Sequence, residues 1–232
     1  MTTIVSAFIY LDNNKNRPLE EDLESGSKLL VLKQNKVIFI DERLYDRLKH
    51  FENDNTVFIK TKIDDLYLYK EKERLGQITI NTDKVKKDTF EYFTLICNKT
   101  EWVKEAINMN IFSSKQYIWI DFCIPRLLPN GFPTDFKPYD GVRIANIWDL
   151  NCVYYGDVYK DVYWYFAGGV FGGNKKDLIV FADLMKEKCI ELIEKQNHIM
   201  WEVNIWYLIW KDNKDLFLPY NCDHNQSIID NY

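Results

Sequence analysis

The chain has 232 residues, a net charge of −5, and an apolar fraction of 47%. A chain of this length can bury a continuous core without disulfides, and its composition is that of an ordinary globular protein. The acidic balance argues against nucleic acid as a partner, because polyanion-binding domains carry a basic excess.

The cysteines also limit the class of protein. There are five of them, an odd number, and all are far apart in sequence. This pattern argues against a zinc cluster and against a secreted disulfide framework. No stretch reaches the eighteen apolar residues of a membrane span, and the N-terminus does not read as a signal peptide. We therefore expect a cytoplasmic protein without a transmembrane segment, and a peripheral association with a membrane stays open.

The first half of the sequence alternates between two kinds of segment. Short apolar, β-branched runs predict buried strands over residues 3–11, 37–40, 56–60 and 117–121. Helices are predicted over residues 17–30, 41–50 and 88–107. The longest of these has Asp88 and Glu91 as a possible capping pair. The alternation favours an α/β fold with a mostly parallel central sheet flanked by helices.

The second half is richer in aromatic residues and glycine. Residues 123–141 are predicted to be an irregular loop, 142–148 a strand, 167–173 a turn, 175–195 and 198–211 helices, and 212–232 a polar tail. Aromatic residues make up 16% of the chain. Rings of this kind pack on sugars in carbohydrate sites, but they also fill cores, and both explanations remain open here.

Two aspartates follow directly after apolar strands. Asp41 follows VIFI, and Asp121 follows YIWI. In open α/β sheets, ligands bind at the carboxyl ends of the strands. A carboxylate at this edge can hold a divalent cation that carries the phosphates of a nucleotide. The alternative for Asp121 is that its side chain only caps a loop.

Several short segments occur in an order that resembles a known family. They read TIVSAF, VIFIDE, CNK, YIWIDFC, FAGGVFGG, MWEVN and DHNQSIID. The sequence is on this basis similar to the HtrL/YibB (WlaTC-like) proteins, which are glycosyltransferase-like with a GT-A fold. The resemblance implies a single GT-A-like domain over residues 1–232. Residues 1–122 would form the nucleotide-binding half and residues 123–232 the half that binds the sugar and the acceptor.

The function implied by this resemblance is that of a nucleotide-sugar-dependent glycosyltransferase. The donor would be a UDP-sugar, the activity hexosyltransferase-like, and the acceptor a glycan, a glycolipid or a related molecule. The other reading is a non-catalytic carbohydrate-binding or scaffold protein on the same fold.

The resemblance also implies a divalent cation, Mn²⁺ or Mg²⁺. GT-A enzymes usually hold it with an Asp-x-Asp motif at a strand end. Here Asp121 is present, but Cys123 stands in the second position, and a thiol is a poor ligand for Mg²⁺ and an unusual one for Mn²⁺. His224, near the C-terminus, would then be the other metal ligand.

Further residues are implied for the nucleotide-sugar site. Ser6 lies in the first strand of this site. Lys99 would neutralise the diphosphate as the bond to the sugar breaks, or it is an ordinary surface lysine. Arg17, after the first strand, could act in the same way. Gly168 and Gly169 would leave room for a sugar, or they form a plain turn.

The last predicted helix begins near Trp201 and Glu202. The resemblance implies that Trp201 packs on a sugar ring and that Glu202 is the catalytic carboxylate. In an inverting reaction, Glu202 would deprotonate the acceptor hydroxyl, whereas in a retaining reaction it would orient the substrate. A glutamate in a first helical turn is also favoured by the helix dipole alone.

Overall fold

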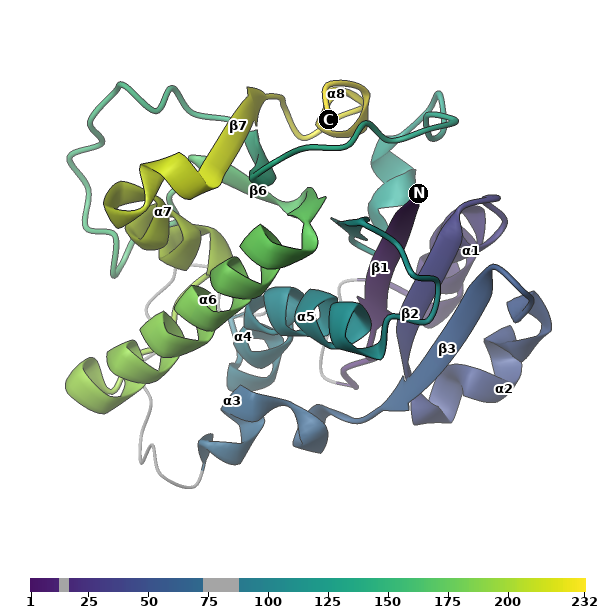
Figure 1. Cartoon of the computed structure of the whole chain (residues 1–232). Coiled ribbons are helices and arrows are strands. Elements are labelled where there is room, and N and C mark those ends of the chain that lie inside the picture. The colour runs from purple at the N-terminus through teal and green to yellow at the C-terminus, as the bar shows by residue number, and fades with distance from the viewer. Residues whose placement is uncertain (13–16, 73–87) are drawn as a thin grey trace.

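The computed structural model describes residues 1–12, 17–72 and 88–232 (Figure 1). Its strands are β1 Thr2–Phe8, β2 Asn35–Asp41, β3 Thr56–Thr61, β4 Gln116–Ile120, β5 Val142–Asn146, β6 Phe166–Asn174 and β7 Phe217–Asn221. They form one sheet in the order β3-β2-β1-β4-β6-β5-β7. Among these described strands, only β6 runs antiparallel to its neighbours, β4 and β5. The predicted α/β class with a mostly parallel sheet is confirmed.

The helices are α1 Leu19–Leu30, α2 Tyr45–Leu48, α3 Tyr67–Lys70, α4 Phe90–Cys97, α5 Lys99–Met109, α6 Lys175–Gln196, α7 Glu202–Asp212 and α8 Ser227–Asp230. They cover the sheet on both faces (Figure 1). Within the described ranges, no helix combines the length and apolarity needed to cross a membrane.

Two hydrophobic clusters, one on each face, hold these layers together. Adjacent strand residues contribute to opposite clusters, because side chains alternate along a strand. Val5 and Trp119 pack with residues of α4, α5, α6 and α7. Ile4 and Ile118 pack with residues of α1, α2 and α8. Strands that are buried on both faces read as continuous apolar runs, which is why β1, β2 and β4 could be recognised in the sequence.

The predicted helix over residues 88–107 is in fact two helices. α4 ends at Cys97 and α5 begins at Lys99, with Asn98 between them. The predicted cap is also wrong, because the Thr89 side chain, not Asp88, accepts the hydrogen bond from the backbone N–H of Tyr92. The break at Asn98 makes Lys99 the first residue of a helix.

The glycine-rich segment predicted as a turn is instead strand β6. Its glycines allow backbones to approach closely. A Cβ at Gly172 would lie 2.6 Å from the backbone oxygen of Tyr117 on the neighbouring strand. A Cβ at Gly168 would lie 2.2 Å from Glu202 Oε1. The glycines that predicted a turn are therefore explained here by the close packing of backbones inside a sheet.

The C-terminal residues also differ from the predicted polar tail. β7 pairs in parallel with β5 at the edge of the sheet. α8 follows it, and both Ile228 and Ile229 are 1% exposed. The polar residues between β7 and α8 carry His224 to the same edge of the sheet as the end of β4.

Candidate functional site

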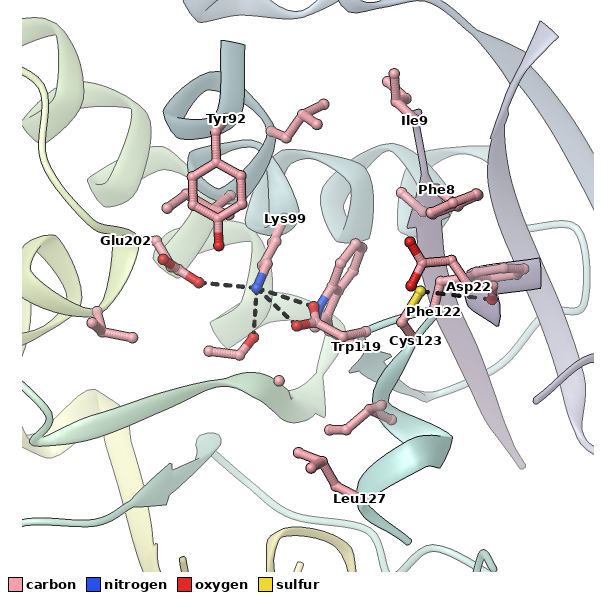
Figure 2. Close-up of a pocket in the computed structure, with 18 of the residues that line it drawn as sticks. Phe8, Ile9, Asp22, Tyr92, Lys99, Trp119, Phe122, Cys123, Leu127 and Glu202 are labelled. Atoms are coloured by element: carbon pink, nitrogen blue, oxygen red, sulfur yellow. Dashed lines mark hydrogen bonds and ion pairs between the residues drawn. The ribbon is translucent and has the colours of Figure 1, made fainter. Parts of the chain in front are cut away.

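A cavity of about 460 Å³ opens at the carboxyl edge of β1 and β4 (Figure 2). Phe8 and Ile9 line it from the end of β1, and Asp121 lines it from the end of β4. The other walls come from α1 and the residue Arg17 before it, from α4 and α5, from β6, from the start of α7, from the segment before α8, and from the 3-10 turn η5 Ile124–Leu127. The cavity thus collects segments that are far apart in the sequence.

Lys99 is the centre of the polar contacts in this cavity. Its Nζ donates to Glu202 Oε1 at 2.9 Å and to the backbone oxygen of Gly168 at 2.9 Å. It also lies 3.0 Å from Asp121 Oδ1 and 3.2 Å from Oδ2. An ammonium has three N–H donors, and these three partners use all of them (Figure 2).

The ends of secondary-structure elements hold these groups in place. Asp121 follows β4, and its backbone N–H donates to the oxygen of Gly169 at 2.9 Å, which fixes it against β6. Glu202 is the first residue of α7, where the helix dipole favours a carboxylate. Lys99 is the first residue of α5, where the same dipole disfavours a cation. The two carboxylates offset this cost.

Burial and charge shift the pKa values of the cluster. Burial alone would lower the pKa of Lys99, but Asp121 and Glu202 outweigh it and raise that pKa, so Lys99 stays charged. Burial raises the pKa of Glu202, and the Lys99 ammonium only partly offsets this. Glu202 is therefore a carboxylate that binds a proton more readily than an exposed one.

Two polar groups of the cavity have no partner among the described residues. They are Glu202 Oε2 and Trp201 Nε1, both shielded from solvent. Trp201 is 7% exposed and Glu202 is 3% exposed. Buried polar atoms normally have hydrogen-bond partners. A buried acceptor and a buried donor are therefore left without a partner at neighbouring positions within the described chain.

The cavity is not built as a metal site held by the protein alone. Trp119 Nε1 donates to Asp121 Oδ1 at 2.7 Å, and both oxygens of Asp121 are in contact with Lys99. Burial raises the pKa of the Cys123 thiol, and its Sγ donates to the backbone oxygen of Asp22 at 3.8 Å. In the part of the chain that the structure describes, no three His, Cys, Asp or Glu side chains are grouped to hold a metal. These donors do not fit a dedicated divalent-cation site.

His224 lines the same cavity as Asp121. Its ring packs edge-on against Trp164, with 5.0 Å between ring centroids. Burial lowers the pKa of His224, and the neighbouring Asp223 only partly opposes this. A neutral imidazole in this place can donate or accept a hydrogen bond to a ligand. Its predicted role as a metal ligand stays a prediction.

The remaining predicted residues divide into two groups. Arg17, Gly168 and Gly169 line the cavity. The space above Gly168 is filled by Glu202, and the space above Gly169 by Ile124, so neither glycine simply leaves room for a sugar. Ser6 is fully buried outside the cavity lining, and its hydroxyl donates to the backbone oxygen of Ile120 at 2.6 Å.

Some residues of the cavity wall were missed in the sequence. They are Tyr92, Trp119, Trp164 and Arg126. Trp119 alternates with Ile118 and Ile120 in an apolar strand, where nothing marks its ring nitrogen as a partner of Asp121. Arg126 is a cation three residues after Cys123 and close in sequence to Asp121, and this short spacing could have marked it as a residue of the same site.

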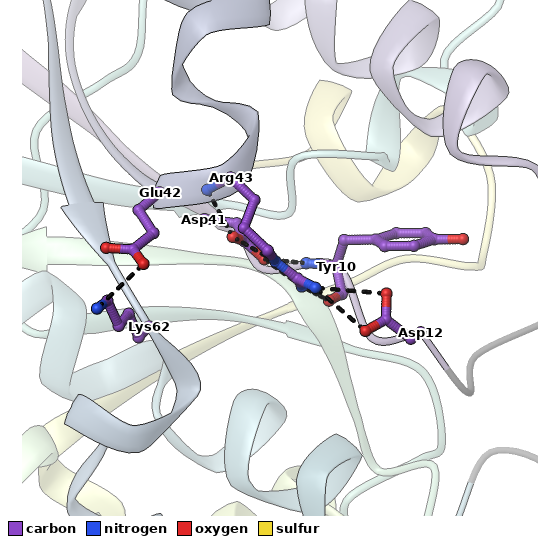
Figure 3. A network of polar contacts seen from close by, with 6 residues as sticks. All are labelled: Tyr10, Asp12, Asp41, Glu42, Arg43 and Lys62. Carbon is purple, nitrogen blue, oxygen red and sulfur yellow. Dashed lines mark hydrogen bonds and ion pairs between the residues drawn. The ribbon is translucent and has the colours of Figure 1, made fainter.

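Asp41, the other strand-end aspartate, lies in a network of polar contacts with Arg43 and Tyr10 (Figure 3). Its carboxylate is 2.7 Å from Arg43 Nη2, and it accepts from the backbone N–H of Tyr10 at 3.3 Å. Burial alone would raise the pKa of Asp41, but its hydrogen bonds to Arg43 outweigh this and lower it. Asp41 does not line the cavity and ties β2 to the segment after β1.

Comparison with known proteins gives a family and a fold. The family described as "Bacterial protein of unknown function (HtrL_YibB)" matches residues 1–224. No curated protein sequence matches the chain. The crystal structure of mouse xyloside xylosyltransferase 1 in its apo form is similar, with a TM-score of 0.52 and 12% identity over 96% of this chain and 86% of that one. At this identity the likeness shows the fold alone, which is that of GT-A glycosyltransferases.

Two other structures are more distant. The glycosyltransferase GlyE of Streptococcus pneumoniae has a TM-score of 0.45 and 12% identity, covering 94% of this chain but 44% of its own. The 4-diphosphocytidyl-2C-methyl-D-erythritol synthase of Anaerococcus prevotii has a TM-score of 0.45 and 9% identity, over 96% of this chain and 87% of that one. Neither likeness is close enough to support a conclusion about this chain.

Proposed function

The chain belongs to the HtrL_YibB family, and we propose that it is a glycosyltransferase. It would transfer a sugar from a nucleoside-diphosphate-sugar donor, a UDP-sugar, to a hydroxyl of a glycan, glycolipid or related acceptor. The observation that carries this proposal is the buried Lys99, which joins Asp121 and Glu202 inside a cavity at the carboxyl edge of the sheet. A shared fold does not by itself give a function.

The size and lining of the cavity suit such a ligand. Its volume of about 460 Å³ lies within the range of small-molecule sites. The wall combines apolar side chains with charged groups and with the rings of Tyr92, Trp164 and Trp201. Aromatic faces next to carboxylates fit a sugar, because the C–H face packs on the rings and the hydroxyls reach the carboxylates.

Glu202 would accept the proton of the attacking hydroxyl. Its Oε2 has no partner among the described residues, whereas Oε1 is bound to Lys99. In this step the acceptor hydroxyl transfers its proton to Glu202, and its oxygen forms a bond to the anomeric carbon. The bond from that carbon to the diphosphate breaks, and the nucleoside diphosphate leaves with the electron pair.

Lys99 would position these groups and not bind the diphosphate itself. Its three donors are directed at Asp121, Glu202 and Gly168. Its charge favours the ionised form of Glu202, which burial alone would disfavour. This role differs from the one predicted from the sequence, in which Lys99 neutralises the diphosphate.

One observation favours a second function, a carbohydrate-binding protein without turnover. Both oxygens of Asp121 are already in contact with Lys99, and Cys123 stands where a second carboxylate would extend the motif. A protein that only holds a sugar needs the rings and the cavity, but it needs no proton acceptor. Turnover therefore separates the two functions.

A thermal-shift panel of UDP-, GDP- and CMP-sugars tests the proposal. A ligand at a hundred times its dissociation constant stabilises a protein by about 2.7 kcal/mol, which corresponds to about 5–10 °C for a chain of this size. We expect a shift with one nucleotide class that is lost in Asp121→Asn. The matched control is Asp183→Asn, which changes a half-exposed carboxylate on α6 that pairs with Lys104. The proposal fails if the folded protein responds to no nucleotide-sugar.

A further inference from the structure

The cavity contains three described lysines or arginines, Arg17, Lys99 and Arg126. Lys99 is committed to its carboxylates and to Gly168. A diphosphate that entered the cavity would therefore meet two cations with donors still available, and both are arginines.

The two arginines lie on one wall. Arg17 precedes α1, and its Nη1 is 3.7 Å from Asp22 Oδ1. Arg126 lies in η5, and its Nη1 donates to the backbone oxygen of Cys123 at 3.0 Å. The Cys123 thiol in turn donates to the backbone oxygen of Asp22 at 3.8 Å. Asp22 and Cys123 thus connect the positions of the two arginines.

Each arginine retains hydrogen-bonding capacity. A guanidinium has five N–H donors, and the contacts above engage only one nitrogen of each. The Arg17 side chain is 34% exposed, and Arg126 is exposed. Guanidinium groups recognise phosphate oxygens in pairs of parallel hydrogen bonds.

The cavity therefore has two ends of opposite charge. At one end Asp121 and Glu202 outnumber the single Lys99, and at the other end Arg17 and Arg126 outnumber Asp22. Figure 2 shows Lys99 and Glu202 on one side of the cavity and Asp22 and Cys123 on the other, with Trp119 between them. A ligand with a phosphate part and a neutral hydroxyl-bearing part has one favourable orientation in this field.

We propose that Arg17 and Arg126 form the diphosphate-binding end of the cavity and so direct the sugar of the donor toward Asp121 and Glu202. This inference rests on the proposed function and adds the residues that orient the donor. The two arginines would compensate the charge of the diphosphate in the bound state and as the nucleoside diphosphate leaves.

Calorimetric titration with UDP, UMP and uridine tests it. The variants are Arg17→Ala and Arg126→Ala, and the matched control is Arg47→Ala, an exposed arginine that pairs with Glu20 outside the cavity. We expect each cavity variant to weaken UDP binding by about tenfold or more, UMP binding by less, and uridine binding by less than about twofold. Arg126→Lys should recover only part of the affinity, because an ammonium cannot pair with two oxygens in parallel.

The outcomes separate this inference from the function on which it rests. If wild-type protein binds UDP and both arginine variants bind it equally well, the arginine assignment is wrong and the glycosyltransferase proposal stands. An equal loss of UDP and uridine binding would also overturn the assignment, because it would place the arginines at the nucleoside. If the folded wild-type protein binds neither UDP nor any UDP-sugar, both proposals fail.

Discussion

Replacing Lys99 by methionine should destabilise the protein substantially. Methionine keeps most of the apolar stem but removes the positive charge that faces the two carboxylates. The Glu202 side chain is 4% exposed and would lose its cation, whereas the Asp121 side chain is 37% exposed and would be partly screened by water. Breaking a buried ion pair costs about 3–5 kcal/mol. Because solvent discounts the Asp121 pair, we expect about 3 kcal/mol.

The expected cost is large enough to measure by thermal unfolding. For a chain of this size it corresponds to a fall of about 6–12 °C in the midpoint. Lys104→Met is the matched control, since Lys104 lies on the same helix and pairs with the half-exposed Asp183. A surface pair of this kind contributes about 0–1 kcal/mol.

A double-mutant cycle then tests the cause. Glu202→Gln removes the stranded charge, so Lys99→Met with Glu202→Gln should cost less than the sum of the two single changes, by about 1–3 kcal/mol. Additive effects would show that Lys99 and Glu202 do not interact. A loss below about 1 kcal/mol in Lys99→Met would refute the proposal that a buried ion pair holds the site together.

Three further predictions concern activity and binding. Burial raises the pKa of Glu202, so activity should fall as the pH drops through a value above the usual range for glutamate of about 4.3; a pH–rate profile with its acid limb at that ordinary value would contradict this. Gly168→Ala should reduce turnover by at least about tenfold, and by more than Gly169→Ala. The new Cβ at position 168 would meet the Glu202 carboxylate, whereas the Cβ at position 169 would meet only the end of the Ile124 side chain. Equal effects of the two changes in a kinetic assay would count against this geometry. Since Lys99 contacts both oxygens of Asp121, UDP affinity in EDTA should stay within about threefold of that in Mn²⁺. If calorimetry shows UDP affinity more than about tenfold weaker in EDTA, the cavity does bind a cation and this prediction is wrong.

The sequence was informative wherever a local pattern determined the structure. β1, β2 and β4 are apolar on both faces, and Asp121 follows β4 at the edge where ligands bind. The last helix was predicted to begin near Trp201 and Glu202, and Glu202 is the first residue of α7; its catalytic role stays a prediction. These features depend on a few neighbouring residues, which is why they could be predicted.

Features that depend on distant residues could not be predicted in the same way. The contact between Lys99 and Glu202 joins positions 103 residues apart, and nothing local indicates it. The glycines of β6 predict a turn, because glycines that allow close packing in a sheet cannot be told in sequence from those of a loop. β7 reads FLPYN, and its Pro219 argues against a strand, so only the pairing with the distant β5 reveals it. The division into nucleotide and acceptor halves, the donor, and the cation stay predictions.

Release of UDP from UDP-sugars is the measurement we would make first on turnover. Wild-type protein, Asp121→Asn and the control Asp183→Asn would be compared with an acceptor glycan present. We expect one UDP-sugar to be consumed by the wild type and the control, and a loss of at least about a hundredfold in the folded Asp121→Asn protein. Equal turnover by Asp121→Asn, or no turnover of any donor by protein that binds it, would contradict the assignment of this cavity as the active site of a glycosyltransferase.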